Sequence, residues 1–134
     1  MNSKRVSFLK HLSNNTRIRI KPSPIHGVGI FAEKDIPKGD DPFRLYKPLD
    51  WQELNKSDIE SLPEHVQKII SDFYAPDGGR IYVPTNGLNV FDISFYMNHS
   101  DSPNMITTDG GENFIAGRDI AAGEELTSDY NTYY

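Results

Sequence analysis

The chain has 134 residues, which suits one domain by the guideline of about 150 residues per domain. Apolar residues make up 37% and charged residues 25%, a globular profile that excludes intrinsic disorder and collagen-like repeats. The absence of cysteine excludes disulfides, thiolate nucleophiles and Cys-ligated zinc. Because no apolar run approaches the roughly 20 residues of a membrane span and residues 1–12 lack a secretory core, we expect an intracellular protein of the cytoplasm or nucleus with no membrane partner.

The net charge of −5 is unevenly distributed along the sequence. Residues 1–38 hold eight basic and two acidic side chains, a balance of +6, so the remainder carries −11. The acidic segment 39–134 favours a cationic ligand or a basic peptide and disfavours nucleic acid as the main target. The basic N-terminal segment can contact either a phosphate or the acidic segment itself.

The N-terminal third predicts an arm followed by short strands. Residues 1–15 suit an arm or a short helix, and residues 17–21 alternate charged and apolar side chains as a half-buried strand does. Pro22 and Pro24 end that strand. We expect further strands at 28–32 and 43–46, with a turn at 35–41 between them.

The middle of the chain predicts a helical insert over residues 47–80. Asp50 and Glu53, and Ser57 and Glu60, have the spacing of capping boxes, so a short helix should begin at each pair. Pro63 suits the first position of another helix. One apolar face of that helix is formed by Val66, Ile69, Ile70 and Phe73. Residues 76–79 should end it.

The C-terminal third predicts strands again. Residues 81–83 and 126–130 read as strands, and a turn at 109–111 joins segments 105–108 and 113–116 as a hairpin. The polar segment 95–104 should form an irregular, ordered loop rather than a strand, because its Asn, His and Ser side chains compete for backbone hydrogen bonds.

One internal repeat predicts pseudo-symmetry. Residues 31–40 match residues 115–124 in Ala, basic, Asp, Ile, Gly and acidic positions, 84 residues on (115 minus 31). Two copies are too few for a solenoid, so we interpret them as two related parts of one domain.

Three segments hold residues that can carry chemistry. His26-Gly27-Val28-Gly29 allows a tight turn or a close backbone approach to a ligand, but it lacks the Gly-Lys-Ser/Thr of a phosphate loop. His99 and Asp101 could ligate a metal, yet no second His has suitable spacing, so no metal site is predicted. A Ser-His-Asp hydrolase built from Ser100 or Ser128, His99 and Asp129 lacks a nucleophile elbow.

The order of three motifs resembles one known family. Gly-Val-Gly at 27–29, Asn-His-Ser at 98–100 and Gly-Glu-Glu-Leu-Thr-Ser-Asp-Tyr at 123–130 resemble the SET domain of protein lysine methyltransferases. The resemblance covers residues 16–134. It implies a mainly β fold of the β-clip type, in which small sheets surround a C-terminal pseudoknot that joins the second and third motifs.

The resemblance also implies a cofactor, a substrate and residue roles. S-adenosylmethionine would be held by Gly27, Val28, Gly29, Asn98, His99 and Tyr134. Tyr130 would be the catalytic residue beside the methyl group, acting on a lysine of a basic protein. The substrate channel would draw on Tyr46, Tyr82, Tyr96 and Tyr133.

Several positions depart from the family pattern. Asp101 stands where a Cys is common, and neither the Cys-rich module nor a Tyr-x-Gly-Glu strand is found. The cofactor cover would come from Tyr133 and Tyr134, from a second subunit in a homodimer, or from the substrate. A catalytically inactive SET-like interaction module is therefore the main alternative, and a metal-dependent hydrolase is a third.

Overall fold

The computed structural model describes residues 2–133 and divides them into two compact units. One unit joins the residues up to Tyr46 to those from Tyr96 onward, and the other is the continuous segment Lys47–Phe95. In the first unit lie α1 (Ser3–Asn15), β1 (Ile18–Pro22), β2 (Val28–Ala32), β5 (Asn98–His99), β6 (Met105–Ile106), β7 (Ile115–Ala116), β8 (Glu125–Ser128) and the 3-10 helix η2 (Tyr130–Thr132). No helix in the described residues is long and apolar enough to cross a membrane.

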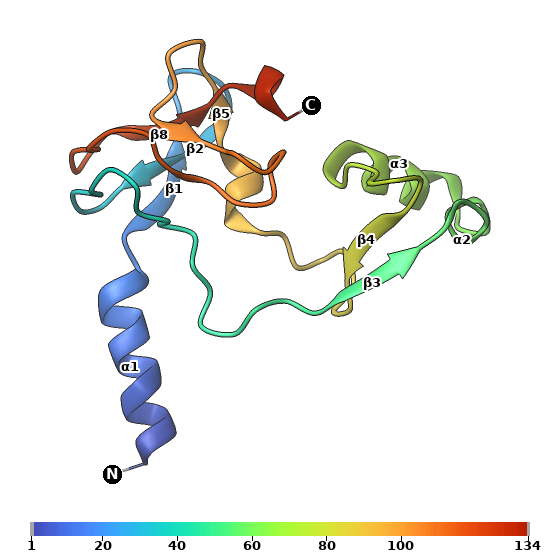
Figure 1. Cartoon of the computed structure of the whole chain (residues 1–134), viewed down its shortest axis with the longest axis horizontal. Coiled ribbons are helices and arrows are strands. Elements are labelled where there is room, and N and C mark those ends of the chain that lie inside the picture. Colours follow the sequence, from blue (N-terminus) through green and yellow to red (C-terminus); the bar gives the residue numbers. More distant parts are fainter. Residues whose placement is uncertain (1, 134) are drawn as a thin grey trace. The chain divides into compact units, whose positions relative to one another are not determined.

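A four-stranded sheet in the order β1-β2-β8-β5 forms the centre of the first unit (Figure 1). β8 runs antiparallel to β2 and parallel to β5, with Asn98 opposite Thr127. Ile30 and Leu126, opposite each other on β2 and β8, are fully buried. The last strand thus lies between β2, which begins within the first motif, and β5, which belongs to the second, so the second and third motifs are neighbours as the family fold predicts.

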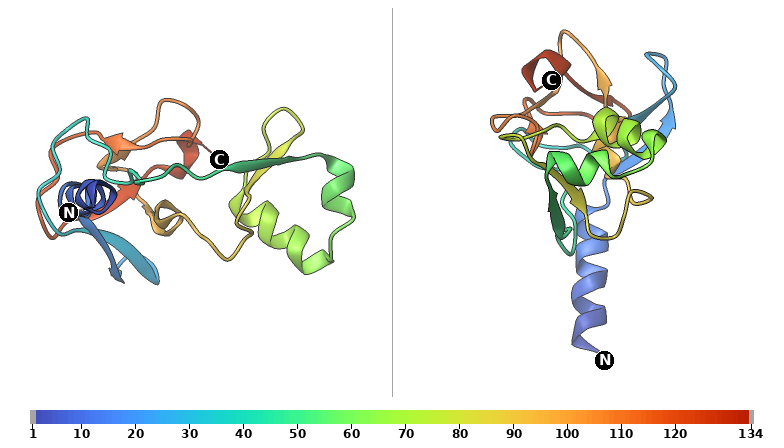
Figure 2. Two further views of the ribbon diagram at one scale, coloured as in Figure 1. Left: turned by 90° about the horizontal axis from the view of Figure 1, so that it is seen from below. Right: turned by 90° about the vertical axis from the view of Figure 1, so that its right-hand side faces the viewer.

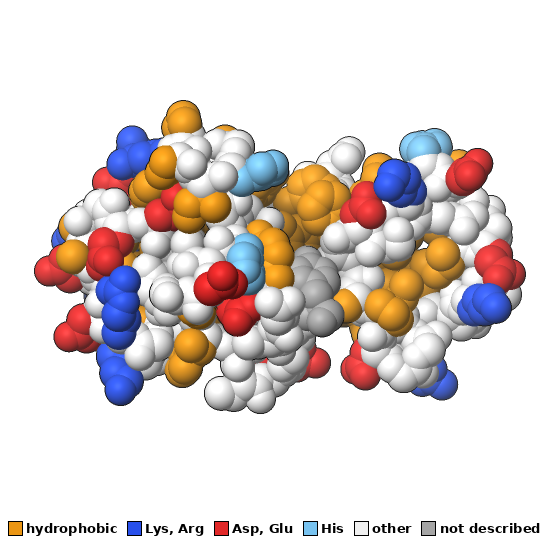
Figure 3. All heavy atoms as spheres, turned by 90° about the horizontal axis from the view of Figure 1, so that it is seen from above, with side chains coloured by type: hydrophobic (Ala, Val, Ile, Leu, Met, Phe, Trp, Pro, Cys, Tyr) orange, Lys and Arg blue, Asp and Glu red, His pale blue; other side chains and the backbone are white. Residues whose placement is uncertain are grey.

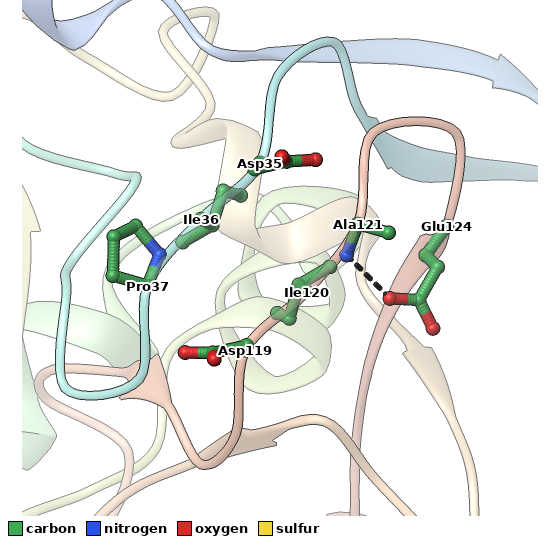
Figure 4. A pocket seen from close by; sticks show the side chains of 7 residues that line it. All are labelled: Asp35, Ile36, Pro37, Asp119, Ile120, Ala121 and Glu124. Carbon is green, nitrogen blue, oxygen red and sulfur yellow. Dashed lines mark hydrogen bonds between the residues drawn. The ribbon is translucent and has the colours of Figure 1, made fainter.

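The predicted internal pseudo-symmetry is confirmed by matching hydrogen bonds. Ile36 and Ile120 exchange backbone bonds of 2.8 and 2.9 Å. The Lys38 N–H donates to Asp119 Oδ1, and its counterpart 84 residues on, the Ala122 N–H, donates to Asp35 Oδ1, both at 2.9 Å. A shallow pocket lies on this junction (Figure 4), lined by Asp35, Ile36, Pro37, Asp119, Ile120, Ala121 and Glu124. The two repeats therefore pack as equivalent halves.

The second unit packs two helices against an antiparallel pair of strands (Figures 1 and 2). Its elements are β3 (Trp51–Leu54), α2 (Lys56–Glu60), α3 (Glu64–Phe73) and β4 (Ile81–Pro84), after which the 3-10 helix η1 (Ile93–Tyr96) leads into the first unit. Ile70, Tyr74 and Val83 form its buried core. The predicted apolar face of α3 is buried most deeply at Ile70, which is 2% exposed.

Three predictions in the middle of the chain were wrong. Residues 43–46 form no strand, because Tyr46 turns toward α1 and its ring lies 5.1 Å from that of Phe8. The expected helix at Asp50 is the strand β3, which pairs with β4 across its whole length. The box that caps α2 uses Asn55 and Asp58 instead of Ser57 and Glu60.

The element ends also differ from the prediction at three places. Pro63 is the N-cap of α3 and not its first residue. Asn98 and His99 form the short strand β5 within the segment expected to be a loop, because β8 offers them a parallel partner. The last strand stops at Ser128, and Tyr130 begins η2.

Candidate functional site

The turn between β1 and β2 presents the first motif. It is closed by the Ser23 N–H, which donates to the Gly27 carbonyl at 2.9 Å. Gly27 has φ of +46°, in the left-handed region that favours glycine, and nothing lies within 4 Å of where its side chain would begin. The backbone of the turn is therefore open to solvent at Gly27.

Asn98 ties β5 to this turn. Its side-chain Nδ2 lies 3.1 Å from the carbonyls of His26 and Val28 and 2.9 Å from Glu125 Oε2. The residue is only 7% exposed. The amide nitrogen thus faces the protein's own turn, and Asn98 holds the Gly27–Gly29 segment against β8.

Gly29 is required by a close approach and not by an unusual φ. A Cβ at this position would lie 2.3 Å from Glu125 Oε2 and 3.0 Å from Asn98 Nδ2. Both distances are below normal van der Waals contact, so the carboxylate occupies the space that a side chain would fill. The second glycine of the first motif is thereby coupled to the third motif.

His99 connects β5 to η2. The Tyr130 backbone N–H donates to His99 Nδ1 at 3.0 Å, and His99 Nε2 lies 2.9 Å from Asp101 Oδ1. Because Nδ1 accepts, the neutral ring carries its proton on Nε2 and donates it to Asp101. His99 thus sets the position of the Tyr130 backbone.

Tyr130 is held from both ends. Its hydroxyl donates to the Met97 carbonyl at 2.5 Å, and its ring centroid lies 5.2 Å from that of His99. Tyr133 packs 5.9 Å from the Tyr130 ring, and its hydroxyl shares a 2.7 Å hydrogen bond with Ser128 Oγ. A phenol so fixed is oriented before any ligand arrives.

Asn104 is a site residue that the sequence reasoning did not nominate. It is 3% exposed, and its Nδ2 donates to the Glu125 carbonyl while its Oδ1 accepts the Thr127 N–H, both at 2.8 Å. The side chain thus acts as an extra strand partner for β8. Ser23 and Glu125 were also not predicted as site residues. Their sequence positions hinted at such a role, since Glu125 lies within the third motif and Ser23 shortly before the first.

The structure links most of the predicted site residues by direct contacts, and the others have different partners. Gly27, Val28, Gly29, Asn98, His99, Tyr130 and Tyr133 are linked by the contacts above. The Tyr46 hydroxyl donates a hydrogen bond to Ser7 Oγ on α1, and the Tyr82 hydroxyl, in the second unit, donates one to Glu53 Oε1. Tyr96 ends η1 and is 37% exposed. Tyr134 lies outside the described residues.

Within residues 2–133, no group of three His, Asp or Glu side chains is arranged to hold a metal ion. The pair of His99 and Asp101 has no third ligand, and the Asp101 side chain is 94% exposed. The polar groups that meet at the site are backbone groups, hydroxyls, amides, the His99 ring and the carboxylates of Asp101 and Glu125. Such a set suits an organic ligand with several polar groups.

The sheet order and the three converging motifs define a SET-type domain. The SET domain family model matches residues 27–131, and the chain belongs to this family. The chain is 30% identical, over 92% of its length, to the Plasmodium falciparum (isolate 3D7) protein named "Putative histone-lysine N-methyltransferase 1", and it spans 2% of that protein's length.

A solved structure has the same fold. The crystal structure of a putative histone methyltransferase of Plasmodium falciparum superposes with a TM-score of 0.51 at 20% identity. The match covers 86% of this chain and 93% of the solved chain. This likeness supports the architecture, including the arrangement of small sheets.

Proposed function

We propose that the chain is an S-adenosylmethionine-dependent protein lysine N-methyltransferase acting inside the cell, in the cytoplasm or nucleus. The observation that carries the proposal is the continuous linkage of Asn98, His99 and Tyr130, in which adjacent residues of β5 fix the glycine turn on one side and the tyrosine on the other. A group-transfer enzyme needs such alignment of donor and acceptor.

The residues present fit this cofactor. Glu125 is a half-buried carboxylate that takes part in no ion pair among the described residues, so the site favours a ligand that carries positive charge. The open backbone at Gly27 suits the amino-acid end of the ligand. When bound, S-adenosylmethionine supplies an electrophilic methyl group on a sulfonium cation.

The acceptor must be a neutral amine, because an ammonium has no lone pair. A free lysine has a pKa of about 10.4, so deprotonation at pH 7 costs about 4.6 kcal/mol. Desolvation of the ammonium in a narrow channel, together with a neighbouring cation, lowers this pKa without a dedicated base. The chain's residues then have to exclude water and align the amine.

Tyr130 supplies alignment and not proton abstraction. Its hydroxyl is already committed as a donor to the Met97 carbonyl, and a phenol that still carries its proton is a poor base. The Met97 carbonyl and the phenol oxygen together form a fixed dipolar surface that can orient an amine or a polarised methyl group.

The substrate class follows from the lysine chemistry and from the relative's name. We infer a basic protein, with histone tails as first candidates. On each of the two units, acidic and basic side chains are interspersed in the view of Figure 3, so each unit offers local ion pairs to a basic peptide instead of one continuous acidic field.

Replacing Tyr130 with Phe tests the proposal. We expect S-adenosylhomocysteine to bind both proteins with similar affinity by calorimetry, because the ring contacts stay, while methyl transfer to histones falls at least about 100-fold, roughly 2.7 kcal/mol. Arg118→Ala is a surface control that should leave both values unchanged. A variant that transfers methyl groups at the parent rate would contradict the assigned role.

A second candidate function is a non-catalytic interaction module. It is favoured by the fact that two of the proposed channel tyrosines, Tyr46 and Tyr82, have hydroxyls that are hydrogen-bonded to Ser7 and Glu53. Binding of S-adenosylhomocysteine without transfer to any basic protein would support this module over the enzyme.

A further inference from the structure

The carboxylate of Glu125 has an unusual set of partners. Oε1 and Oε2 lie 2.7 and 2.9 Å from Ser23 Oγ, and Oε2 lies 2.9 Å from Asn98 Nδ2. Both donors are uncharged, and no Lys, Arg or His of the described chain forms an ion pair with Glu125. The neighbouring Glu124 is paired with Arg118 instead.

The Ser23 hydroxyl is oriented by this carboxylate. A hydroxyl has one proton and two lone pairs, and a carboxylate can only accept, so the proton points to Glu125. The lone pairs then face the Ile25 N–H at 3.0 Å and Asn98 Nδ2 at 3.1 Å. Glu125 thereby sets the direction of the hydrogen bonds that the Ser23 hydroxyl makes inside the turn.

The Asn98 amide is oriented in the same way. Every acceptor around Nδ2 is an oxygen, and the carboxylate oxygen is the closest at 2.9 Å. The carboxylate also fills the space beside Gly29, since a Cβ there would lie 2.3 Å from Oε2. One side chain therefore contacts the start of the turn, its second glycine and the strand that carries the second motif.

We propose that Glu125 is a positioning residue that acts through Ser23 and Asn98 to hold the turn at 23–29 in the shape that receives the cofactor. The cofactor part of this inference rests on the proposed function. The acceptor-only character of the carboxylate is essential, because an amide in its place keeps one acceptor oxygen and turns an N–H toward one of the two donors.

The test uses Glu125→Gln, with Glu124→Gln as the matched control that removes the same charge one residue earlier. Hydrogen exchange of the Ile25 amide, in protein without cofactor, measures the turn directly. We expect exchange about tenfold faster or more in Glu125→Gln and unchanged in Glu124→Gln. S-adenosylhomocysteine should bind Glu125→Gln about tenfold more weakly by calorimetry, with the control at the parent value.

The outcomes separate the two proposals. Unchanged hydrogen exchange of the Ile25 amide in Glu125→Gln overturns the positioning role. Faster exchange also overturns it if the variant binds S-adenosylhomocysteine as tightly as the parent protein does. A parent protein that binds no S-adenosylhomocysteine overturns the proposed function, and the exchange measurement still decides the effect on the turn. Should Glu125→Gln fail to fold, Ser23→Ala removes the same carboxylate partner. Because it also removes the acceptor of the Ile25 N–H, its readout is the affinity for S-adenosylhomocysteine, which is expected to be about tenfold weaker, and an affinity equal to the parent's overturns the positioning role.

Discussion

Substitution of Gly29 by Ala probes the tightest contact of the site. The new Cβ would lie 2.3 Å from Glu125 Oε2 and 2.8 Å from Cδ, so the carboxylate must leave its place. Leaving means loss of the hydrogen bonds from Ser23 and Asn98 to a charged acceptor, each with a net value of about 1.5 kcal/mol. We expect Gly29→Ala to lower the free energy of unfolding by about 3 kcal/mol, a large share of a domain's usual 5–15.

A double-mutant cycle separates this clash from other effects of the methyl group. In a Glu125→Ala background the carboxylate is absent and only the 3.0 Å approach to Asn98 Nδ2 is left, so the same substitution should cost less than about 1 kcal/mol. Urea unfolding followed by circular dichroism gives all four free energies. Equal costs of Gly29→Ala in both backgrounds, within about 0.5 kcal/mol, would refute the reasoning.

Three further predictions concern the surrounding structure. Asn104→Ala should lower the free energy of unfolding by about 2–4 kcal/mol in urea titrations, because the Glu125 carbonyl and the Thr127 N–H lose a buried hydrogen-bond partner. A loss below about 1 kcal/mol would show that these two backbone groups do not depend on the Asn104 side chain. Asp35→Ala and Asp119→Ala should each cost about 1 kcal/mol, since their bonds are related by the pseudo-symmetry, and costs that differ by more than about 1 kcal/mol would argue against equivalent halves. The hydrogen bonds from the Asn113 side chain and backbone lower the pKa of Asp109, so its stabilising effect is complete above the unfolded pKa and is lost as the pH falls through the folded pKa. Asn113→Ala should raise that pKa in an NMR titration of the carboxyl carbon, whereas an unchanged pKa would refute the assignment.

The residue pattern of a single short segment predicted strands and turns correctly where that pattern alone is typical of the element. Residues 28–32 were expected as a strand and form β2 with those bounds, because a run of apolar and small residues suits a buried strand. Residues 81–83 and the hairpin around 109–111 were likewise found, although the hairpin strands are shorter than expected. The repeat could be recognised from the sequence because residues 31–40 and 115–124 match in residue type, and the structure adds matching hydrogen bonds.

Local pattern failed where distant partners decided the conformation. The spacing of Asp50 and Glu53 is typical of a helix start, yet pairing with residues 81–84 makes this segment a strand. Asn98 and His99 carry side chains that favour loops, yet parallel pairing with β8 makes them a strand. In both cases the hydrogen bonds of a neighbouring strand outweigh a propensity of a few tenths of a kcal/mol.

The sequence by itself determined the family, because three motifs in a fixed order identify a SET domain without any distance. It nominated Asn98, His99 and Tyr130, which the structure places in one network. Only the tertiary structure decided the supporting residues Ser23, Asn104 and Glu125. Each of these acts on a segment far away in the chain, such as Ser23 on Glu125, and hydrogen bonds between distant segments leave no periodic trace in a sequence.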